Sequence, residues 1–496
     1  MLFHSSTYVI FLGLAYAGYW LLFGRRKLAA AWLIAASYTF FAVGAYERAG
    51  EDVASGRVVW GGPMGWAVLG LVILFVGSTL DYVLGLALEA TTGIWQRRAL
   101  LLASVSYYLG VLAFFKYVDF FRGALSNVLA LAGVSYAAEP INLALPFGIS
   151  FFTFETMSYT IDVYRREMPA CRSYRDYLLF VSFFPHLVSG PIVRPHAILP
   201  QIAEPARIDD ARIARALFRI AKGLGKKVIF GDYLAHHLVN RAFQHPEWHS
   251  SVELALAVYG YAFQLYADFS GYTDIALGSA QLFGFELPEN FDHPYQSKDL
   301  QEFWRRWHIS LSSWLRDYLY IPLGGSRGSN FATYRNLALT MVLGGLWHGS
   351  TWNFVVWGAL HGGALAIARA WQRTGISKRT PALQGFGWGA FSWALTFHYV
   401  CFAWVFFKAP DLSRATGMLK GLAACTLPAP NIHAGYILCL AAAIAVHFMP
   451  KRIVARVEES FIAANPLLRG AALAAVVFAV HALRGTRVEP FVYGQF

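Results

Sequence analysis

Long apolar runs, rather than alternating apolar and polar positions, dominate the chain. Runs close to the roughly 20 residues that cross a bilayer recur from one end to the other. Lipid leaves only helices or closed barrels viable, and the lack of alternation favours helices. We therefore predict an all-α polytopic membrane protein with about 11 to 13 membrane segments. The clearest spans lie near Thr7–Phe23, Leu28–Gly44, Gly65–Leu88, Ala99–Phe121, Asn336–Trp371, Gly389–Phe407, Tyr436–Met449 and Gly470–Leu483.

Polar interruptions mark segments of a different kind. Pro146–Tyr164 and Tyr177–Val193 are apolar but interrupted by Pro and Gly, so both are predicted to be short or re-entrant. Ala211–Ile229 carries a basic face beside an apolar one, which predicts an interfacial helix on the cytoplasmic side. Val252–Phe283 is a long apolar segment that we expect to break at Asp268–Asp274.

The whole chain, residues 1–496, is predicted to form one integral membrane domain. A four-helix N-terminal part at about 1–135 precedes a core at about 140–410 and C-terminal helices at about 430–496. We find no tandem repeat, low-complexity tract or soluble domain that would divide it further.

Composition and charge narrow the class of protein. Hydrophobic residues make up 57% of the chain and charged residues only 14%, whereas a soluble domain carries about 25% charge. The net charge of +12 fits basic cytoplasmic loops better than nucleic-acid binding. Arg25–Lys27 follow the first apolar segment, which predicts an uncleaved N-terminus that lies outside. The four cysteines form no CxxC pair, so we predict neither a metal site nor a disulfide scaffold.

His348 is the first candidate functional residue, because Asn336–Ala368 holds it without any Asp, Glu, Lys or Arg. An ionisable side chain there is a functional candidate, although a buried histidine bonded to a neighbouring helix is an equal alternative. As one helix the stretch would extend about 50 Å, so bends are expected at Gly344–Gly345 and Gly349–Ser350. Measured from Asn336, His348 would lie about 18 Å along the helix, near mid-membrane.

His308 is the second candidate, and it stands in a segment, Ser297–Leu323, that is predicted to be one amphipathic helix. Asp299 and Glu302 resemble an N-terminal capping pair. The Trp and Arg residues of the segment would serve equally well as an interfacial anchor. The arginines beside His308 are expected to favour its neutral form, which suits proton acceptance.

Two such histidines are typical of general-base chemistry. No cysteine, GxSxG serine or HExxH motif lies nearby as an alternative. A neutral His348 could take the proton of an acceptor hydroxyl that attacks a thioester, and return it to the thiolate. The indole N–H of Trp347 or the amide of Asn353 could stabilise the oxyanion. For Asp268–Asp274, a cation site and a proton relay stay open, but packing between helices beside a cytoplasmic arginine is favoured.

At these residues the chain resembles a known family. The run Trp304–Tyr318, followed by Leu346–Gly349, is similar to membrane-bound O-acyltransferases (MBOATs), and most similar to their bacterial alginate O-acetyltransferase branch. Gly494 stands where that branch would have an aromatic residue. Further motifs of the resemblance are Leu145–Phe154, Ser189–Ile192, Tyr266–Asp274, Asn290–Phe291 and the ending Pro490–Phe496.

The resemblance implies a ring of helices around a funnel, in the inner membrane of a bacterium. It implies that His348 is catalytic and that His308 is the second family histidine, nearer the cytoplasm. It implies no bound cofactor, but an acyl thioester co-substrate from coenzyme A or an acyl carrier protein. Membrane lipids and a periplasmic acetyltransferase are the implied partners. Candidate donor-binding residues are Arg305, Trp307, Trp347 and Asn353.

The expected function is O-acetylation of an extracytoplasmic polysaccharide such as alginate. The alternative is a transporter or flippase for a glycan or lipid precursor, in which His348 serves a proton relay. Inverted repeats, which are frequent in transporters, are not visible in the sequence.

Overall fold

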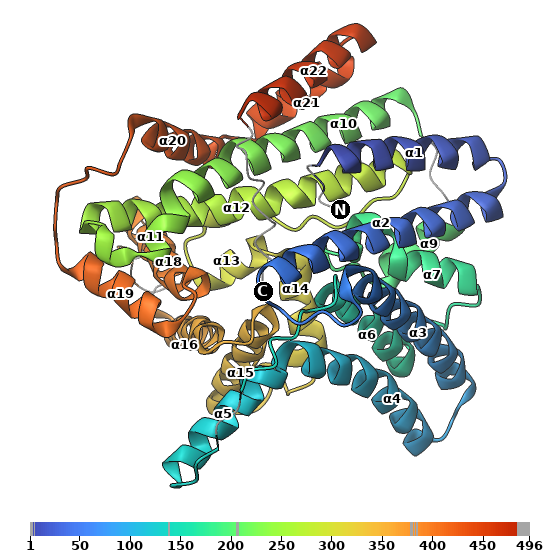
Figure 1. The fold of residues 1–496 in the computed structure, drawn as a ribbon, viewed down its shortest axis with the longest axis horizontal. Coiled ribbons are helices and arrows are strands. Elements are labelled where there is room, and N and C mark those ends of the chain that lie inside the picture. The colour runs from blue at the N-terminus through green and yellow to red at the C-terminus, as the bar shows by residue number, and fades with distance from the viewer. Residues whose placement is uncertain are drawn as a thin grey trace. The chain divides into compact units, whose positions relative to one another are not determined.

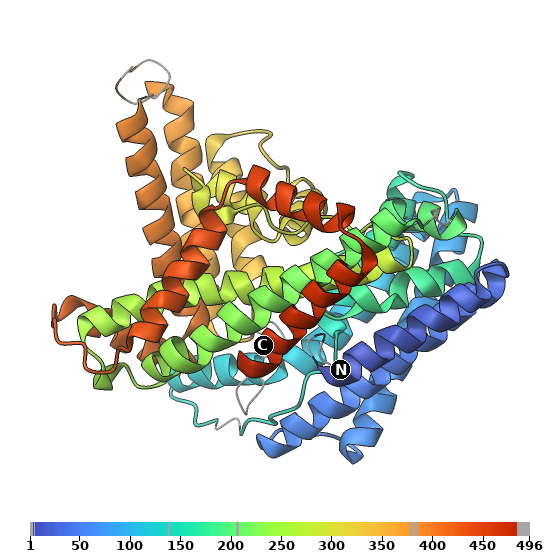
Figure 2. The ribbon, with the colours of Figure 1, turned by 90° about the horizontal axis from the view of Figure 1, so that it is seen from above.

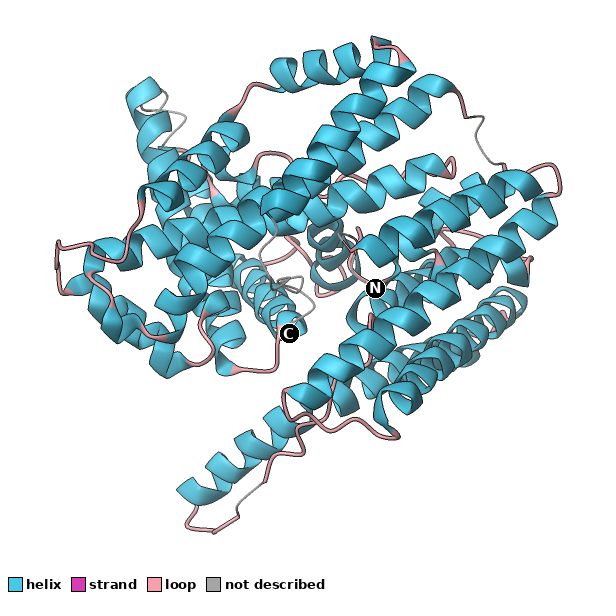
Figure 3. Ribbon diagram, turned by 45° about the horizontal axis from the view of Figure 1, so that its top comes forward, coloured by secondary structure: helices cyan, strands magenta, loops and turns pink. Residues whose placement is uncertain are grey.

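A computed structural model describes residue 3 and residues 5–136, 139–204, 208–376, 380, 382 and 385–483. Apart from two isolated β-bridges, every regular element among these residues is a helix, as Figure 3 shows. The predicted all-α fold class is confirmed for this part of the chain. The C-terminal motif Pro490–Phe496 lies outside the described residues.

The helices form two compact units, whose boundaries lie within α10 (Asp210–Leu224) and α12 (Ser251–Leu282). The predicted division into three parts by chain order stays a prediction. The first unit spans Met1–Ala216 and Ala276–Pro288. Besides parts of α10 and α12 it contains α1 (Ser6–Leu22), α2 (Arg26–Ala54), α3 (Gly62–Ala90), α4 (Ile94–Leu112), η1 (Ala113–Tyr117), α5 (Val118–Leu131), α6 (Ile149–Arg165), α7 (Tyr174–Ser182), α8 (Phe184–Leu187) and α9 (Pro195–Ala203).

The core of the first unit is built around α2, α3 and α6. Helix α2 packs against α1, α3 and α7, while α6 packs against α3 and α4 (Figure 1). Most residues of α6 are buried, 13 of its 17. The predicted short segment Pro146–Tyr164 is thus an interior helix rather than a lipid-facing one, which fits its polar residues, because buried polar groups need protein partners.

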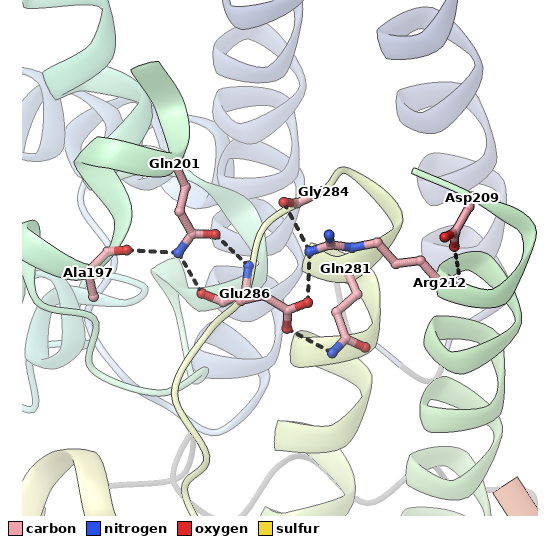
Figure 4. Close-up of polar contacts among 7 residues, drawn as sticks. All are labelled: Ala197, Gln201, Asp209, Arg212, Gln281, Gly284 and Glu286. Carbon is pink, nitrogen blue, oxygen red and sulfur yellow. Dashed lines mark hydrogen bonds and ion pairs between the residues drawn. The ribbon is translucent and has the colours of Figure 1, made fainter. Parts of the chain in front are cut away.

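Polar contacts join α9 to the chain that follows α12 (Figure 4). Gln201 donates a hydrogen bond to the Glu286 carbonyl oxygen at 3.0 Å and accepts one from the Glu286 N–H at 2.8 Å. The Glu286 carboxylate accepts from Gln281 at 3.0 Å and from Arg212 at 2.7 Å. At the start of α10, Asp209 accepts from the backbone N–H of Arg212 at 2.8 Å. Four local segments of the first unit are therefore held by one network.

The second unit spans Leu217–Ile275 and Glu289–Phe496 and contains both candidate histidines. Within it, α16 (Trp352–Thr374) and α18 (Phe386–Lys408) run side by side, in orange in Figure 2. Its further elements are η2 (Gly225–Asp232), η3 (Ala235–Val239), α11 (Asn240–Gln244), η4 (Pro246–Trp248), η5 (Pro294–Gln296), α13 (Leu300–Arg306), α14 (Ile309–Leu315), η6 (Arg316–Tyr320), α15 (Asn330–His348), α16 (Trp352–Thr374), α18 (Phe386–Lys408), α19 (Leu412–Ala423), α20 (Ala434–Phe448), α21 (Lys451–Ala463) and α22 (Pro466–Leu483).

Side-chain caps set the starts of several of these helices. Asp299 accepts a hydrogen bond from the Glu302 N–H at 2.8 Å, which confirms the predicted cap before α13. Ser329 accepts from the Ala332 N–H at 3.1 Å and starts α15 in the same way. Asp411 does so before α19. Such caps satisfy N–H groups that have no partner inside the helix.

Five helical segments among the described residues are long and apolar enough to cross a membrane. A sixth span results if α20 and α21, bent by 89°, are counted together. The chain is therefore a multi-pass membrane protein, while the larger number of segments expected from the sequence stays a prediction. The five segments are Arg26–Ala54, Gly62–Ala90, Ile94–Leu131, Trp352–Thr374 and Phe386–Lys408.

Two expectations about helix continuity are wrong. Helix α12 runs unbroken through Asp268–Asp274, because the small Gly271 serves close helix packing instead of a break. A Cβ on Gly271 would meet the Gly223 carbonyl oxygen at 2.7 Å. Conversely, Ser297–Leu323 is not one helix, since α13 ends at Arg306 and α14 begins only at Ile309.

Candidate active site

His348 is the last residue of α15, and a three-residue turn leads from it into α16. The two helices pack along one another as an antiparallel hairpin (Figure 1). Of the two predicted bends, only the one at Gly349–Ser350 is present, because α15 continues through Gly344–Gly345. His348 therefore stands at a helix end beside a turn, and its depth in a bilayer stays a prediction.

Glycines bring the two helices of this hairpin unusually close. A Cβ on Gly362 would lie 2.8 Å from the Ala338 Cα, and one on Gly358 would lie 2.8 Å from the Val342 Cα. A Cβ on Gly345 would collide with the Phe354 carbonyl oxygen. Small residues spaced four apart allow backbones to approach in membrane helices. The distance between the two helices of the hairpin is therefore fixed by backbone contact rather than by flexible side chains.

Aromatic rings surround the His348 imidazole, and only 4% of the residue is exposed. The ring centroid lies 4.9 Å from that of Trp347, 5.2 Å from that of Trp357 and 5.2 Å from that of Phe407. These three rings come from α15, α16 and α18. Such an enclosure limits the access of bulk water to a reacting group.

His308 is fully buried between α13 and α14, in a left-handed backbone conformation with φ of 43°. Its position is held by the preceding segment: the Ile309 N–H donates to the Asn290 carbonyl oxygen at 3.0 Å. The Asn290 side-chain oxygen also accepts from the N–H and the hydroxyl of Ser310, at 3.1 and 2.9 Å. Hydrogen bonds between Asn290 and the segment His308–Ser310 therefore fix the position of the His308 imidazole.

The same asparagine sets the tautomer of His308. His308 Nδ1 lies 3.1 Å from the Asn290 side-chain oxygen, which can only accept. Nδ1 therefore carries the hydrogen, and Nε2 keeps the lone pair that can accept a proton or a hydrogen bond. Burial lowers the pKa of His308 to about 3, so the predicted neutral form is confirmed. Its cause is desolvation rather than the neighbouring arginines, one of which, Arg306, pairs with Glu302 at 2.6 Å.

Trp347 brings the two histidines into one site. Its ring lies 4.9 Å from His348 and 6.3 Å from His308, centroid to centroid. Phe269 of α12 packs edge-on against the other imidazole, His308, at 4.7 Å. Two buried imidazoles near one indole can remove a proton and orient a polar substrate, as general-base catalysis requires.

The remaining predicted donor-binding residues have different surroundings. One side-chain N–H of Asn353 is donated to the Ala409 carbonyl oxygen at 2.7 Å, which ties the start of α16 to the end of α18. Trp307 is buried and stacks on Phe303 at 5.7 Å with an interplanar angle of 14°. Arg305 is exposed on α13. Only Trp347 among the four contacts both histidines, and the donor-binding roles stay predictions.

The two aspartates of α12, Asp268 and Asp274, are engaged in ion pairs. Asp274 pairs with Arg219 at 3.2 Å and with Lys226 at 2.9 Å. Asp268 pairs with Lys227 at 2.6 Å, and both of these side chains are almost fully buried. Of the favoured interpretation, packing between helices beside a cytoplasmic arginine, the pairing of Asp274 with an arginine is confirmed, while the cytoplasmic location stays a prediction.

Two polar contacts escaped the sequence-based search. Asn290 was part of a motif but had no assigned role, although a buried asparagine shortly before a candidate histidine is a signal for a tautomer-fixing partner. In the first unit, His186 Nδ1 lies 2.9 Å from a Glu155 carboxylate oxygen, and neither side chain is exposed. The same carboxylate accepts from the Val193 N–H at 3.0 Å. A carboxylate and a histidine in neighbouring apolar segments would have predicted that pair.

Comparisons with known proteins decide the family. A model of the membrane-bound O-acyltransferase family matches residues 142–409, which include both histidines and the whole α15–α16 hairpin. The chain belongs to the MBOAT family. The resemblance inferred from its motifs is confirmed, and this MBOAT is accordingly an acyltransferase that uses an acyl donor as co-substrate.

Curated relatives cover most of this MBOAT. It is 39% identical over 430 residues to the probable alginate O-acetylase of Pseudomonas aeruginosa, covering 85% of this chain and 75% of the relative. It is 34% identical to the peptidoglycan O-acetyltransferase of Helicobacter pylori, covering 85% and 80% of the two chains. A teichoic acid D-alanyltransferase of Streptococcus thermophilus is 32% identical over 46% of this chain and 57% of its own.

Proposed function

We propose that this MBOAT transfers acetyl groups from a cytoplasmic thioester across a bacterial inner membrane for O-acetylation of an extracytoplasmic polysaccharide such as alginate. The names of its relatives, which concern alginate and peptidoglycan O-acetylation, support this substrate class over a transporter. The assignment of the active site rests on the contact of the Trp347 ring with the rings of both His308 and His348.

In the proposed reaction His348 is the general base. Its imidazole takes the proton of an acceptor hydroxyl while that oxygen attacks the carbonyl carbon of the thioester. The tetrahedral intermediate then collapses, the C–S bond breaks, and the imidazolium returns its proton to the leaving thiolate. The products are an O-acetyl ester and a free thiol, with no covalent enzyme intermediate. Exclusion of water by the three aromatic rings protects the thioester from hydrolysis.

His308 is assigned a supporting role in this reaction. Its Nε2 lone pair can accept a hydrogen bond from a substrate, because Asn290 holds the hydrogen on Nδ1. Trp347 is the favoured oxyanion donor, since Asn353 already donates a side-chain hydrogen bond to the Ala409 carbonyl oxygen. Arg305, which is exposed, is suited to anionic parts of a donor, whereas Trp307 supports the site by packing.

The proposal includes a topology and partners. We place the N-terminus outside and Arg25–Lys27 in the cytoplasm by the positive-inside rule. Acetyl-CoA or an acyl carrier protein would deliver the acetyl group, and a periplasmic acetyltransferase would receive it. Alkaline phosphatase, which is active only outside the cytoplasm, should be inactive when fused after Lys27. An active fusion would contradict the orientation.

The central experiment replaces His348 with alanine in a strain that lacks the wild-type gene. Loss of a general base costs about 100-fold to 10,000-fold in rate, so the acetyl content of the secreted polysaccharide should fall to background. The amount of polysaccharide secreted should not change. A folded His348→Ala protein that still acetylates fully would refute the proposed role.

His447 provides a matched control, because it is a buried histidine of the same unit, 2% exposed, without ring contact to His348. His447→Ala should leave acetylation well above that of His348→Ala. If both variants lose acetylation alike while melting normally, the effect is not specific to the proposed base. If His348→Ala stops secretion itself, the transporter alternative gains support.

A further inference from the structure

A third buried histidine, His361, lies on α16 beside the candidate base. It is fully buried, and neither of its ring nitrogens has a hydrogen-bond partner among the described residues. Its ring centroid lies 4.8 Å from Trp357, which in turn contacts His348 at 5.2 Å. A buried polar group without a partner is costly and rare in native proteins, so such a group requires an explanation.

The tryptophans next to His361 also have buried polar groups without a hydrogen-bond partner among the described residues. The indole N–H groups of Trp304, Trp357 and Trp404 are all buried without a hydrogen-bond acceptor in the described part of the chain. Their rings lie 5.1, 4.8 and 6.3 Å from the His361 ring. Three donors and a neutral imidazole, which offers one donor and one acceptor, thus gather in one place. Together they match the two to four polar partners that a buried water molecule needs.

A groove of about 1370 Å³ is lined by residues next to this cluster, although not by the four cluster residues themselves. Its lining includes Leu300 of α13, Ala364 of α16 and Tyr399 of α18. Ala364 lies one helical turn beyond His361, and Leu300 lies one turn before Trp304. The Tyr399 ring is 6.4 Å from the His361 ring, centroid to centroid. The lining of the groove also includes the polar side chains of Lys298, Asp299 and Gln372, which water can solvate.

We propose that His361 and the three indoles form a buried water site, and that His361 acts as a positioning residue for the reaction. Each bound water molecule accepts from at most two of the indole N–H groups and donates to the imidazole, so that it bridges the indoles to His361. Trp357 is thereby held edge-on to His348, at an interplanar angle of 89°. The His348 ring keeps the orientation in which its nitrogen meets the acceptor hydroxyl. This inference rests on the proposed base role of His348.

The test compares a polar and an apolar replacement of His361. His361→Gln keeps a donor and an acceptor, whereas His361→Leu removes both. Rates are measured with radiolabelled acetyl-CoA in membranes that contain the full set of partner proteins. We expect His361→Leu to lower kcat about tenfold with little change in KM, because misorientation affects the reaction rather than binding. His361→Gln should restore most of kcat.

A purely structural histidine predicts the opposite pattern. His361→Leu would then match or exceed His361→Gln in kcat, and that result overturns the proposal. His447 is the matched control, because both of its ring nitrogens also lack hydrogen-bond partners within the described ranges, but its ring contacts lie elsewhere. Leu and Gln replacements of His447 should give equal kcat values, and a difference as large as at His361 would count against a special role.

Two further measurements keep the test decisive. If His361→Leu does not fold, Trp304→Phe removes one indole donor while keeping a ring, and a lowered kcat supports the proposal while an unchanged one refutes it. An experimental map that resolves water should contain density between His361 and the indoles, and a dry pocket would overturn the water site. An active His348→Ala variant would instead refute the proposed function, which distinguishes the two failures.

Discussion

Replacing Gly358 with alanine should push α15 and α16 apart and slow acyl transfer. The added Cβ would lie 2.8 Å from the Val342 Cα, and closer still to the Met341 carbonyl oxygen. Both are backbone atoms and cannot rotate away. Ordinary contact begins near 3.4 Å, so the helices must separate by about 0.6 Å or more.

This displacement acts directly on the proposed site. Gly358 follows Trp357, which contacts His348 across the hairpin. A misplacement of about 1 Å can cost about 100-fold in rate, so we expect a loss of about 10-fold to 100-fold in kcat. Overpacking of this kind also costs about 1 to 3 kcal/mol of stability. The loss of activity should therefore accompany a lower melting temperature but exceed what partial unfolding explains.

Gly363→Ala is the matched control in the same helix. A Cβ on Gly363 would meet nothing within 4 Å. Alanine favours a helix over glycine by about 1 kcal/mol, so this variant should melt at the same or a higher temperature and acetylate normally. Both variants are assayed by acetyl transfer in membranes and by thermal melting in detergent. If Gly358→Ala is as active and as stable as Gly363→Ala, the close-packed hairpin is not what positions His348.

Three other replacements test separate parts of the molecule. Asn290→Ala should lower kcat about tenfold by releasing the tautomer of His308, while Asn290→Asp, which keeps an acceptor, should lose less in the same acetyl-transfer assay. Glu155→Ala should destabilise the protein by about 1 to 3 kcal/mol, because it leaves the buried His186 ring nitrogen without this hydrogen-bond partner, and an unchanged melting temperature would contradict this. Arg212→Ala removes an ion pair whose carboxylate, Glu286, is exposed (Figure 4), and it should cost at most about 1 kcal/mol with normal acetylation. A strongly destabilised variant would show that the network matters more than the exposure of Glu286 suggests.

Periodicity and local signals predicted the parts of the fold that depend on neighbouring residues along the chain. The cap at Asp299 and the amphipathic character of α10 needed nothing else, whereas the interfacial location of α10 stays a prediction. Tertiary contacts decided the rest. Asp268–Asp274 contains the polar residues and glycine of a broken helix, yet α12 stays continuous, because Gly271 admits another backbone and the carboxylates find basic partners. The residue pattern within Asp268–Asp274 cannot predict those partners, because they lie elsewhere in the chain.

The same limit explains the candidate site. Sequence periodicity assigned His308 to the interior of one helix, but it lies in the short connection between two, with a left-handed backbone that is unfavourable for a residue with a side chain. Such conformations cost about 1 to 3 kcal/mol and persist only where the surroundings enforce them. Here Asn290 enforces it with bonds to His308 and Ser310.

His348 likewise lies at a helix end, where the chain turns into α16. A side chain at a helix end is not enclosed by the following turn of its own helix, so rings from other elements can set its orientation. For His348 these are Trp357 and Phe407. Both imidazoles are thus positioned by residues distant in the sequence, which is why composition and spacing could nominate them but could not predict how they are held.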